Sequence, residues 1–179
     1  MRLIIIAFAE QSSPCTGRCL LIDPIDLAIL RRLQANARIA NADIARQLEM
    51  APSAILDRIR KLEQRGVITG YLTRIAPAAV GLGLTAFVFV RSEERVGTGT
   101  IGAALARIPE VLEVHHVAGE DCYLVKVRVA DTEALSRLLR DRFGRLKGVR
   151  STRTTVVLST TKESPVLPLP AEPEVAHDA

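Results

Sequence analysis

The side chains best suited to chemistry in this chain are cations and hydrogen-bonding groups gathered near residue 60. Ser53, Asp57, Arg58, Lys61 and Arg65 recur at intervals that place them on the outer side of one helix. Arg and Lys can bind guanine edges or phosphates, while Ser and Asp can meet base edges or amide donors. The pattern therefore indicates a recognition helix that reads duplex DNA.

Two short helices joined by a tight break must position these side chains. Apolar residues recur at helical spacing in both: Ile44, Ala45 and Leu48 in the first, and Ile55, Leu56, Ile59 and Leu62 in the second. Asn41 can cap the first helix, Pro52 suits the first turn of the second, and Gly66 ends it. Ala45 is small enough to let the helices cross closely. Together these features predict a helix-turn-helix, whose second helix enters a major groove about 12 Å wide. The alternative is an ordinary helical hairpin with a solvated basic face.

Other basic residues support contact with DNA. Arg38 and Asn41, at the start of the first helix of the pair, are expected to contact backbone phosphate. The first third of the chain is rich in cations: Arg31, Arg32, Arg38, Arg46, Arg58, Arg60, Lys61, Arg65 and Arg74. The net charge of +4 and the pI near 9.3 permit a nucleic-acid partner without requiring one.

The composition bounds the class of protein. With 179 residues, 48% hydrophobic and 25% charged, the chain has room for two small soluble domains. The three cysteines, Cys15, Cys19 and Cys122, include no second Cys or His pair at zinc spacing, so we expect free thiols, no metal and no cofactor. No apolar run approaches the ~20 residues of a membrane span, and the apolar start is short for a signal peptide. A cytoplasmic, nucleoid-associated location is expected.

Residues 21–74 are predicted to form the DNA-binding domain, after an N-terminal extension, 1–20, that we expect to be disordered apart from a possible short strand. The domain begins at Asp23-Pro24-x-Asp26, which combines a cap, a first-turn proline and a first-turn acid. Ile25, Ile29 and Leu33 repeat toward its core. Residues 67–72 alternate like a short strand and would form a wing, and residues 75–83 form the linker.

Residues 84–162 are predicted to form a ferredoxin-like βαββαβ domain, which makes the whole chain α+β. Strands are expected at 84–90, 111–118, 123–129 and 149–158. Two helices are expected between them: one carries Ile101, Leu105 and Ile108, and the other, capped near Asp131, carries Leu135, Leu138, Leu139 and Phe143. The tail 163–179 is rich in proline, and we expect it to be disordered.

The predicted sheet carries both helices on one face. The other face would expose many apolar residues, which a soluble protein covers most simply by pairing two copies across a two-fold axis. A homodimer through this domain is therefore expected. His115 and His116 are neighbours on a strand, so they point to opposite faces and cannot hold one metal together.

The chain resembles the Lrp/AsnC, or feast/famine, family of transcription regulators over about Ile22 to Thr161. The motifs that carry the resemblance are Asp23-x-x-Asp26, Leu56-Asp-Arg-Ile-Arg-Lys-Leu-Glu-x-x-Gly66-Val-Ile, Gly119-Glu-Asp-Cys-Tyr123 and Arg153-Thr-Thr-Val-Val. The resemblance implies a winged helix-turn-helix domain, a dimerising effector domain, further assembly into octamers, and amino acids or related metabolites as effectors.

Three residues depart from the family pattern. Glu49 stands at a turn position that often holds Gly, where a positive φ costs roughly 1 kcal/mol. Ala51 stands where a Ser cap is usual, which loses about 1 kcal/mol unless Ser53 compensates. Cys122 stands where many relatives carry Asp, which leaves the identity of the ligand open.

The effector site is expected at the turn 119–123 and the facing strand. A zwitterionic amino acid needs backbone donors for its carboxylate and an acid or carbonyl for its ammonium group, and a glycine-containing acidic turn supplies both. The candidate residues are Gly119, Glu120, Asp121, Cys122, Tyr123, Thr152 and Thr154. A plain polar hairpin turn is the alternative.

The sequence thus predicts a sequence-specific DNA-binding transcriptional regulator that responds to an amino acid, and not an enzyme. No Ser-His-Asp arrangement, phosphate loop or paired-carboxylate motif is recognisable. Two alternatives stay open: a nucleoid-type protein that coats DNA, and an enzyme like the sirohaem decarboxylases of the same fold. The decarboxylases carry a pocket motif rich in His and Tyr, whereas 119–123 resembles the regulator version.

Overall fold

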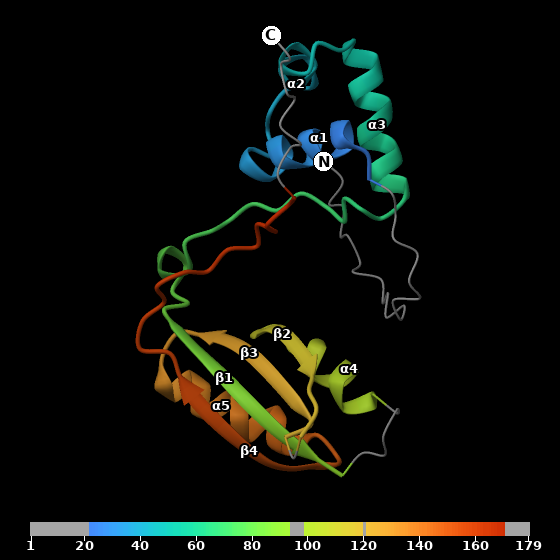
Figure 1. Ribbon diagram of the computed structural model, residues 1–179. Helices are drawn as coiled ribbons and strands as arrows, with labels where there is room; N and C mark the ends of the chain where they lie inside the picture. Colours follow the sequence, from blue (N-terminus) through green and yellow to red (C-terminus); the bar gives the residue numbers. More distant parts are fainter. Residues whose placement is uncertain (1–21, 94–98, 120, 171–179) are drawn as a thin grey trace, which may run out of the picture. The chain divides into compact units, whose positions relative to one another are not determined.

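The computed structural model describes residues 22–93, 99–119 and 121–170. They divide into two compact units, a first unit within Met1–Leu72 and Val166–Ala179 and a second unit within Thr73–Pro165 (Figure 1). The predicted extension 1–20, with Cys15 and Cys19, lies outside the described residues. Within the described parts of the chain, no helix has the length and apolar character that a membrane crossing demands.

The described residues of the first unit form three helices, α1 (Pro24–Ala35), α2 (Asn41–Gln47) and α3 (Pro52–Gln64). The start of α1 is as predicted: the Asp23 side chain accepts a hydrogen bond from the amide of Asp26 at 2.7 Å, and Pro24 occupies the first turn. Gly66 follows the end of α3 with φ 69°, and the amide of Val67 bonds to the carbonyl of Leu62 at 2.9 Å.

The core of this unit joins all three helices. Its buried residues are Ile29, Ile44, Ala45, Ile55 and Ile59. Ala45 is only 1% exposed, so a larger side chain has no room there. Two predicted core residues are wrong: Leu56 is half-buried, and Ile25 is 36% exposed while Ala28 takes the buried position on α1.

Two local predictions for this unit are also wrong. Asn41 is the first residue of α2, and the cap position belongs to Ala40, which makes no side-chain cap. Residues 67–72 form no strand. The amides of Val67 and Ile68 both bond to the carbonyl of Leu62 at the end of α3, so the chain there completes a helix terminus instead of joining a ladder.

The turn between α2 and α3 confirms two sequence observations. Glu49 adopts φ 53°, the left-handed conformation that disfavours residues with a Cβ. Ala51 caps α3 without any side-chain hydrogen bond. The turn between α2 and α3 is therefore held by packing and by backbone hydrogen bonds, among them the bond from the amide of Met50 to the carbonyl of Ala45 at 2.9 Å.

We expect Glu49→Gly to raise the free energy of unfolding by about 1 kcal/mol, because glycine adopts this φ without strain. Gln64→Gly is the matched control. It places glycine in a helical residue of α3 and should lower stability by about 0.5–1 kcal/mol. Thermal unfolding followed by circular dichroism measures both. Equal destabilisation by the two variants would show that the turn at Glu49 is not strained.

The second unit has the predicted βαββαβ order. Its elements are β1 (Leu84–Ser92), α4 (Thr100–Ala106), β2 (Val111–His116), β3 (Tyr123–Val129), α5 (Thr132–Asp141) and β4 (Val149–Val156), with 3₁₀ turns at Pro77–Val80 and Phe143–Arg145. The strands form one antiparallel sheet in the order β2-β3-β1-β4. Asp131 caps α5, since its Oδ1 accepts from the amide of Ala134 at 2.7 Å. In Figure 1, α5 lies behind β1 and β4.

The two faces of this sheet differ strongly. Alternate residues of β1 and β3 pack with α4 and α5 in one core: Ala86, Val88, Val90, Tyr123, Val125, Val127 and Val129. The opposite face, here called the open face, carries Phe87, Phe89 and Leu124, all half-buried, beside Lys126 and Arg153. The open face is therefore less apolar than the sequence pattern predicts, because charged residues interrupt its aromatic ones.

Candidate DNA-binding and effector sites

Arg58 does not occupy the exposed position that its spacing predicts. Its Nη1 donates to Oδ2 of Asp23 at 2.5 Å and to Oδ1 of Asp26 at 2.7 Å, and its side chain is 29% exposed. Asp26 itself is buried. Arg58 therefore ties α3 to the start of α1, and its contact with guanine or phosphate stays a prediction.

The ion pair changes the ionisation of its members. Burial tends to raise the pKa of Asp23, but hydrogen bonds from the amide of Asp26 and from Arg58 outweigh that and lower it. The pKa of Arg58 is raised, first by its hydrogen bond to Asp23 and then by that to Asp26. The carboxylate of Asp23 also lies in the first turn of α1, where the helix dipole favours negative charge.

The other predicted residues of α3 remain available to a partner. Ser53, Asp57 and Lys61 are exposed, and Lys61 has no ionic partner among the described residues. Asp57 and Lys61 border a hollow of about 480 Å³. Its lining residues are Asp23, Asp26, Met50, Ala54, Asp57, Arg58, Lys61 and Arg65. Hydrogen-bonding and cationic groups thus line one side of the helix.

The residues expected to contact phosphate are placed less uniformly. Arg38 is exposed, and its amide bonds to Oδ1 of Asn36 at 2.9 Å, which fixes the backbone before α2. Asn41 is half-buried. Arg46, on the exposed side of α2, pairs with Asp43 at 3.2 Å. Arg38 is therefore the better placed of the two predicted phosphate contacts.

The predicted effector turn lies between β2 and β3 and leads into the start of β3. Gly119 is exposed with φ 135°, and Glu120 is outside the described residues. Asp121 is held by Arg153 of β4, whose Nη2 donates to Oδ2 at 2.9 Å. The guanidinium carbon of Arg153 also lies 4.1 Å from the centre of the Phe89 ring. Asp121 and Arg153 thus place opposite charges side by side on the open face.

Three predicted effector residues lie elsewhere. Tyr123 is 5% exposed, and its ring is packed so closely that a Cβ on Gly102 would come within 2.8 Å of Cε1. Thr152 and Thr154 pair with Val90 and Val88, which face the helices, so they lie on the side of the sheet away from Arg153. A shift of one residue in the pairing of β4 moves each of its side chains to the other face of the sheet, and the sequence motif does not determine this pairing.

Cys122 lies at the same turn, and its thiol contacts Ser92 at the end of β1. Its thiol is half-buried and donates to the carbonyl of Ser92, with Sγ and O 3.8 Å apart. The polar side chain of Ser92 lowers the pKa of the Cys122 thiol, and the charge of Arg91 lowers it further. The cysteine is therefore attached to the end of β1, next to Asp121.

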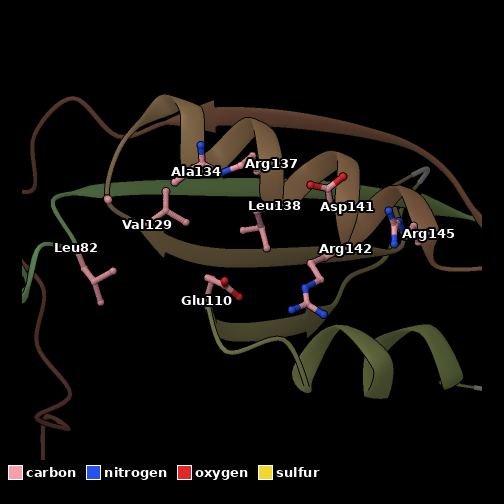
Figure 2. A pocket seen from close by; sticks show the side chains of 10 residues that line it. Leu82, Glu110, Val129, Ala134, Arg137, Leu138, Asp141, Arg142 and Arg145 are labelled. Carbon is pink, nitrogen blue, oxygen red and sulfur yellow. The ribbon is translucent and has the colours of Figure 1, made fainter.

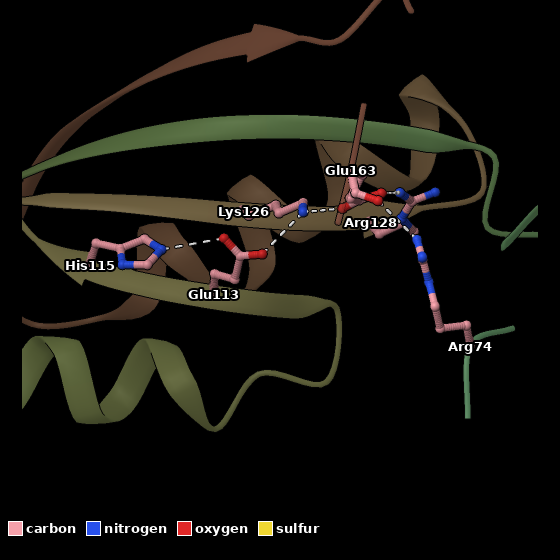
Figure 3. A network of polar contacts seen from close by, with 6 residues as sticks. All are labelled: Arg74, Glu113, His115, Lys126, Arg128 and Glu163. Carbon is pink, nitrogen blue, oxygen red and sulfur yellow. Dashed lines mark hydrogen bonds and ion pairs between the residues drawn. The ribbon is translucent and has the colours of Figure 1, made fainter. Parts of the chain in front are cut away.

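A second polar network crosses the open face (Figure 3). The Lys126 ammonium bonds to Glu113 at 3.0 Å and to Glu163, and Glu113 also lies 3.3 Å from His115. Arg128 donates to Glu163 at 3.3 Å, and Arg74 donates to its backbone carbonyl at 2.9 Å. The hydrogen bond from Lys126 to Glu163 lowers the pKa of the Glu163 carboxyl group. Sequence patterns did not reveal the network, because its partners are far apart along the chain.

The start of the predicted disordered tail therefore makes specific contacts. Residues 163–170 form no helix or strand, yet Glu163 neutralises cations of the second unit. In the first unit, the amide of Leu167 bonds to Oε1 of Gln34 at 2.8 Å. The two histidines lie as predicted: His115 is opposite Leu124 on the open face, and His116 is opposite Tyr123, with ring centres 5.2 Å apart.

Comparison with known proteins gives two domain matches. Residues 22–69 match a winged helix-turn-helix DNA-binding family, and residues 85–167 match the Lrp/AsnC ligand binding domain. The leucine-responsive regulatory protein of Haemophilus influenzae is 36% identical over 151 residues, which cover 83% of this chain and 90% of that protein. Its namesake in Escherichia coli K12 is 34% identical over 145 residues, covering 80% and 88%.

Solved structures agree with these matches. The feast or famine regulatory protein of Mycobacterium tuberculosis, complexed with L-methionine, has a TM-score of 0.76 and 37% identity, and covers 83% of this chain and 99% of that one. A transcriptional regulator of Neisseria meningitidis, also in complex with L-methionine, has a TM-score of 0.76 and 31% identity, with coverages of 82% and 96%. Both are similar to this chain over nearly their whole length.

Proposed function

We propose a function from the premise that this chain belongs to the Lrp/AsnC family of transcriptional regulators. It binds specific double-stranded DNA, and its assembly or DNA affinity changes when an amino acid binds. The observation that carries this function is the union, in one chain, of a helix-turn-helix at 22–69 and an Lrp/AsnC ligand binding domain at 85–167. The chemistry is recognition, and no catalytic step is assigned to any residue.

For DNA, we assign the reading surface to the exposed side of α3. Lys61 supplies a cation for guanine or phosphate, and Ser53 and Asp57 supply hydrogen-bonding groups for base edges or amide donors. Arg38 supplies a phosphate contact from the segment before α2. Arg58 helps to position this surface, because its ion pairs with Asp23 and Asp26 hold α3 against the start of α1.

For the effector, we assign the turn Gly119 to Cys122 together with Arg153. Two relatives were solved with L-methionine, which makes an amino acid the expected ligand class. Asp121 can bind an ammonium group, and Arg153 can bind a carboxylate once a ligand separates the two. The present pair of Asp121 and Arg153 then acts as the closed state that a zwitterion opens.

For assembly, we propose a homodimer through the open face, with octamers as a further step, in the cytoplasm on nucleoid DNA. Phe87 and Phe89 supply aromatic surface for the interface. The charge of Lys126 is already neutralised within the chain by Glu113 and Glu163, so a second copy does not have to supply a counter-charge. A sedimentation run that shows only monomer at micromolar concentration would exclude the dimer.

DNA specificity tests the proposed function. In fluorescence anisotropy at near-physiological salt, we expect duplex from the upstream region of the protein's own gene to bind at least about tenfold more tightly than random duplex. Binding should weaken steeply as salt rises, because cations on the protein replace counterions of the phosphates. Equal affinity for both duplexes would favour the DNA-coating alternative, and no binding would remove the function.

The effector assignment has its own test. Calorimetric titration with L-methionine should show weaker binding at the turn in Asp121→Asn, by about tenfold, because the variant loses the negative charge that holds the ammonium group. Asp43→Asn, on α2 of the first unit, is the control and should leave that affinity unchanged. An Asp121→Asn protein that binds like the wild type would move the effector site away from the turn.

A further inference from the structure

A second hollow lies on the helix side of the second unit, away from the turn 119–123 (Figure 2). Its volume is about 490 Å³, which is within the range of small-molecule sites. Its walls combine apolar and ionic groups. Leu82, Val129 and Leu138 provide the apolar part, and Glu110, Arg142 and Arg145 provide charges of both signs.

Glu110 carries an unsatisfied buried oxygen in this hollow. Its Oε2 is buried and has no hydrogen-bond partner among the described residues. Its backbone is fixed by the bond from the amide of Arg128 to the carbonyl of Glu110 at 2.9 Å, just before β2. A buried carboxylate oxygen without a hydrogen bond raises the free energy of the folded chain. A ligand that donates a hydrogen bond to this oxygen removes that cost and forms a charged hydrogen bond.

Two arginines of the hollow have no acidic partner in the part of the chain that the structure describes. Arg142 and Arg145, which follow α5, form no ion pair with a described residue, whereas Arg137 pairs with Glu133 at 2.9 Å and Asp141 is held by Arg140 at 3.2 Å. Figure 2 shows the side chains of Glu110 and Arg142 entering the hollow from different elements. Complementary charges therefore border one space without neutralising each other.

We propose that this hollow is a second binding site, for an α-amino acid with an apolar side chain. Glu110 binds the ammonium group, Arg142 and Arg145 bind the carboxylate, and the side chain of the ligand lies against Val129 and Leu138. Such a ligand carries a cation and an anion on adjacent atoms, which matches the charges of the hollow. The site differs from the turn that we assign to the effector, so it goes beyond the proposed function and does not depend on it.

The test is a titration of the full chain with L-methionine, followed by calorimetry and by amide chemical shifts. The wild type should bind two equivalents per chain, and Glu110→Gln and Arg142→Gln should each bind one, with at least tenfold weaker binding at residues 110, 129 and 138. Arg107→Gln, an exposed arginine of the same unit outside the hollow, is the control and should bind two. Arg142 is exposed, so its variant keeps the fold even if Glu110→Gln does not.

Two analogues test the ligand class. The 2-oxo acid of methionine lacks the ammonium group, and 3-(methylsulfanyl)propylamine lacks the carboxylate, so neither should shift the amides of the hollow. One equivalent in the wild type that vanishes in Asp121→Asn, with no change in Glu110→Gln or Arg142→Gln, would overturn the proposal. Loss in the two hollow variants but not in Asp121→Asn would support it and remove the turn from the proposed function.

Discussion

Arg58→Ala is expected to destabilise the first unit by about 2–4 kcal/mol, because it leaves the buried carboxylate of Asp26 without its cation. The matched control is Arg60→Ala, an exposed residue of the same helix, which should change stability by less than about 0.5 kcal/mol. Hydrogen exchange of the core amides in α1 and α3 reports the stability of this unit alone. Equal protection in both variants would show that the ion pair contributes nothing.

The same pair has a dependence on pH. The pKa of Asp23 is lower in the folded chain than its ordinary value of 3.8. The contribution of Asp23 is therefore fully present above that ordinary value and is lost as the pH falls through the lowered one. Wild-type stability should fall more steeply than that of Arg58→Ala as the pH drops below the ordinary pKa of 3.8, because alanine has already removed one cause of the low pKa. Parallel acid-unfolding curves would contradict this.

Lys61→Ala is expected to weaken binding to the upstream duplex by about 1–3 kcal/mol, roughly 5- to 150-fold. Lys61 is an exposed cation on α3 without an ionic partner among the described residues, so its charge is free to bind DNA. Lys147→Ala, an exposed lysine of the second unit, is the control and should leave affinity unchanged. Anisotropy on upstream and random duplexes measures both variants.

The two duplexes also separate the possible roles of Lys61. A loss confined to the upstream duplex would assign it to a guanine edge. An equal loss on both, with a smaller dependence on salt, would assign it to a phosphate. Unchanged affinity on both duplexes would contradict the assignment of the reading surface to this side of α3.

Much of the fold could be predicted because its signals are local. Asp23 and Pro24 mark the start of α1 within four residues, and the strained φ of Glu49 follows from its place in a short turn. The alternation of β3 is strict, so its buried face was evident from the sequence. The βαββαβ order follows from such elements taken in sequence.

The site was harder to predict because its contacts are long-range. Arg58 lies on the polar side of α3, and periodicity cannot reveal that acids 32 and 35 residues away hold it. The paired acids at 23 and 26 are visible in the sequence, but their local pattern indicates only the start of a helix. Thr152 and Thr154 lie on the face away from the Asp121–Arg153 pair for a geometric reason: strand register, which no single motif determines, places Arg153 beside Asp121 instead.

The coupling between effector and DNA is the central claim of this account. The direct measurement is fluorescence anisotropy of the full chain with upstream duplex, at fixed salt, with and without an amino-acid pool that includes L-methionine. We predict that the pool changes the dissociation constant for the upstream duplex several-fold, as a coupling of about 1–3 kcal/mol requires, and that random duplex stays weak and unresponsive. Identical affinities for both duplexes, unchanged by the pool, would contradict a ligand-responsive regulator.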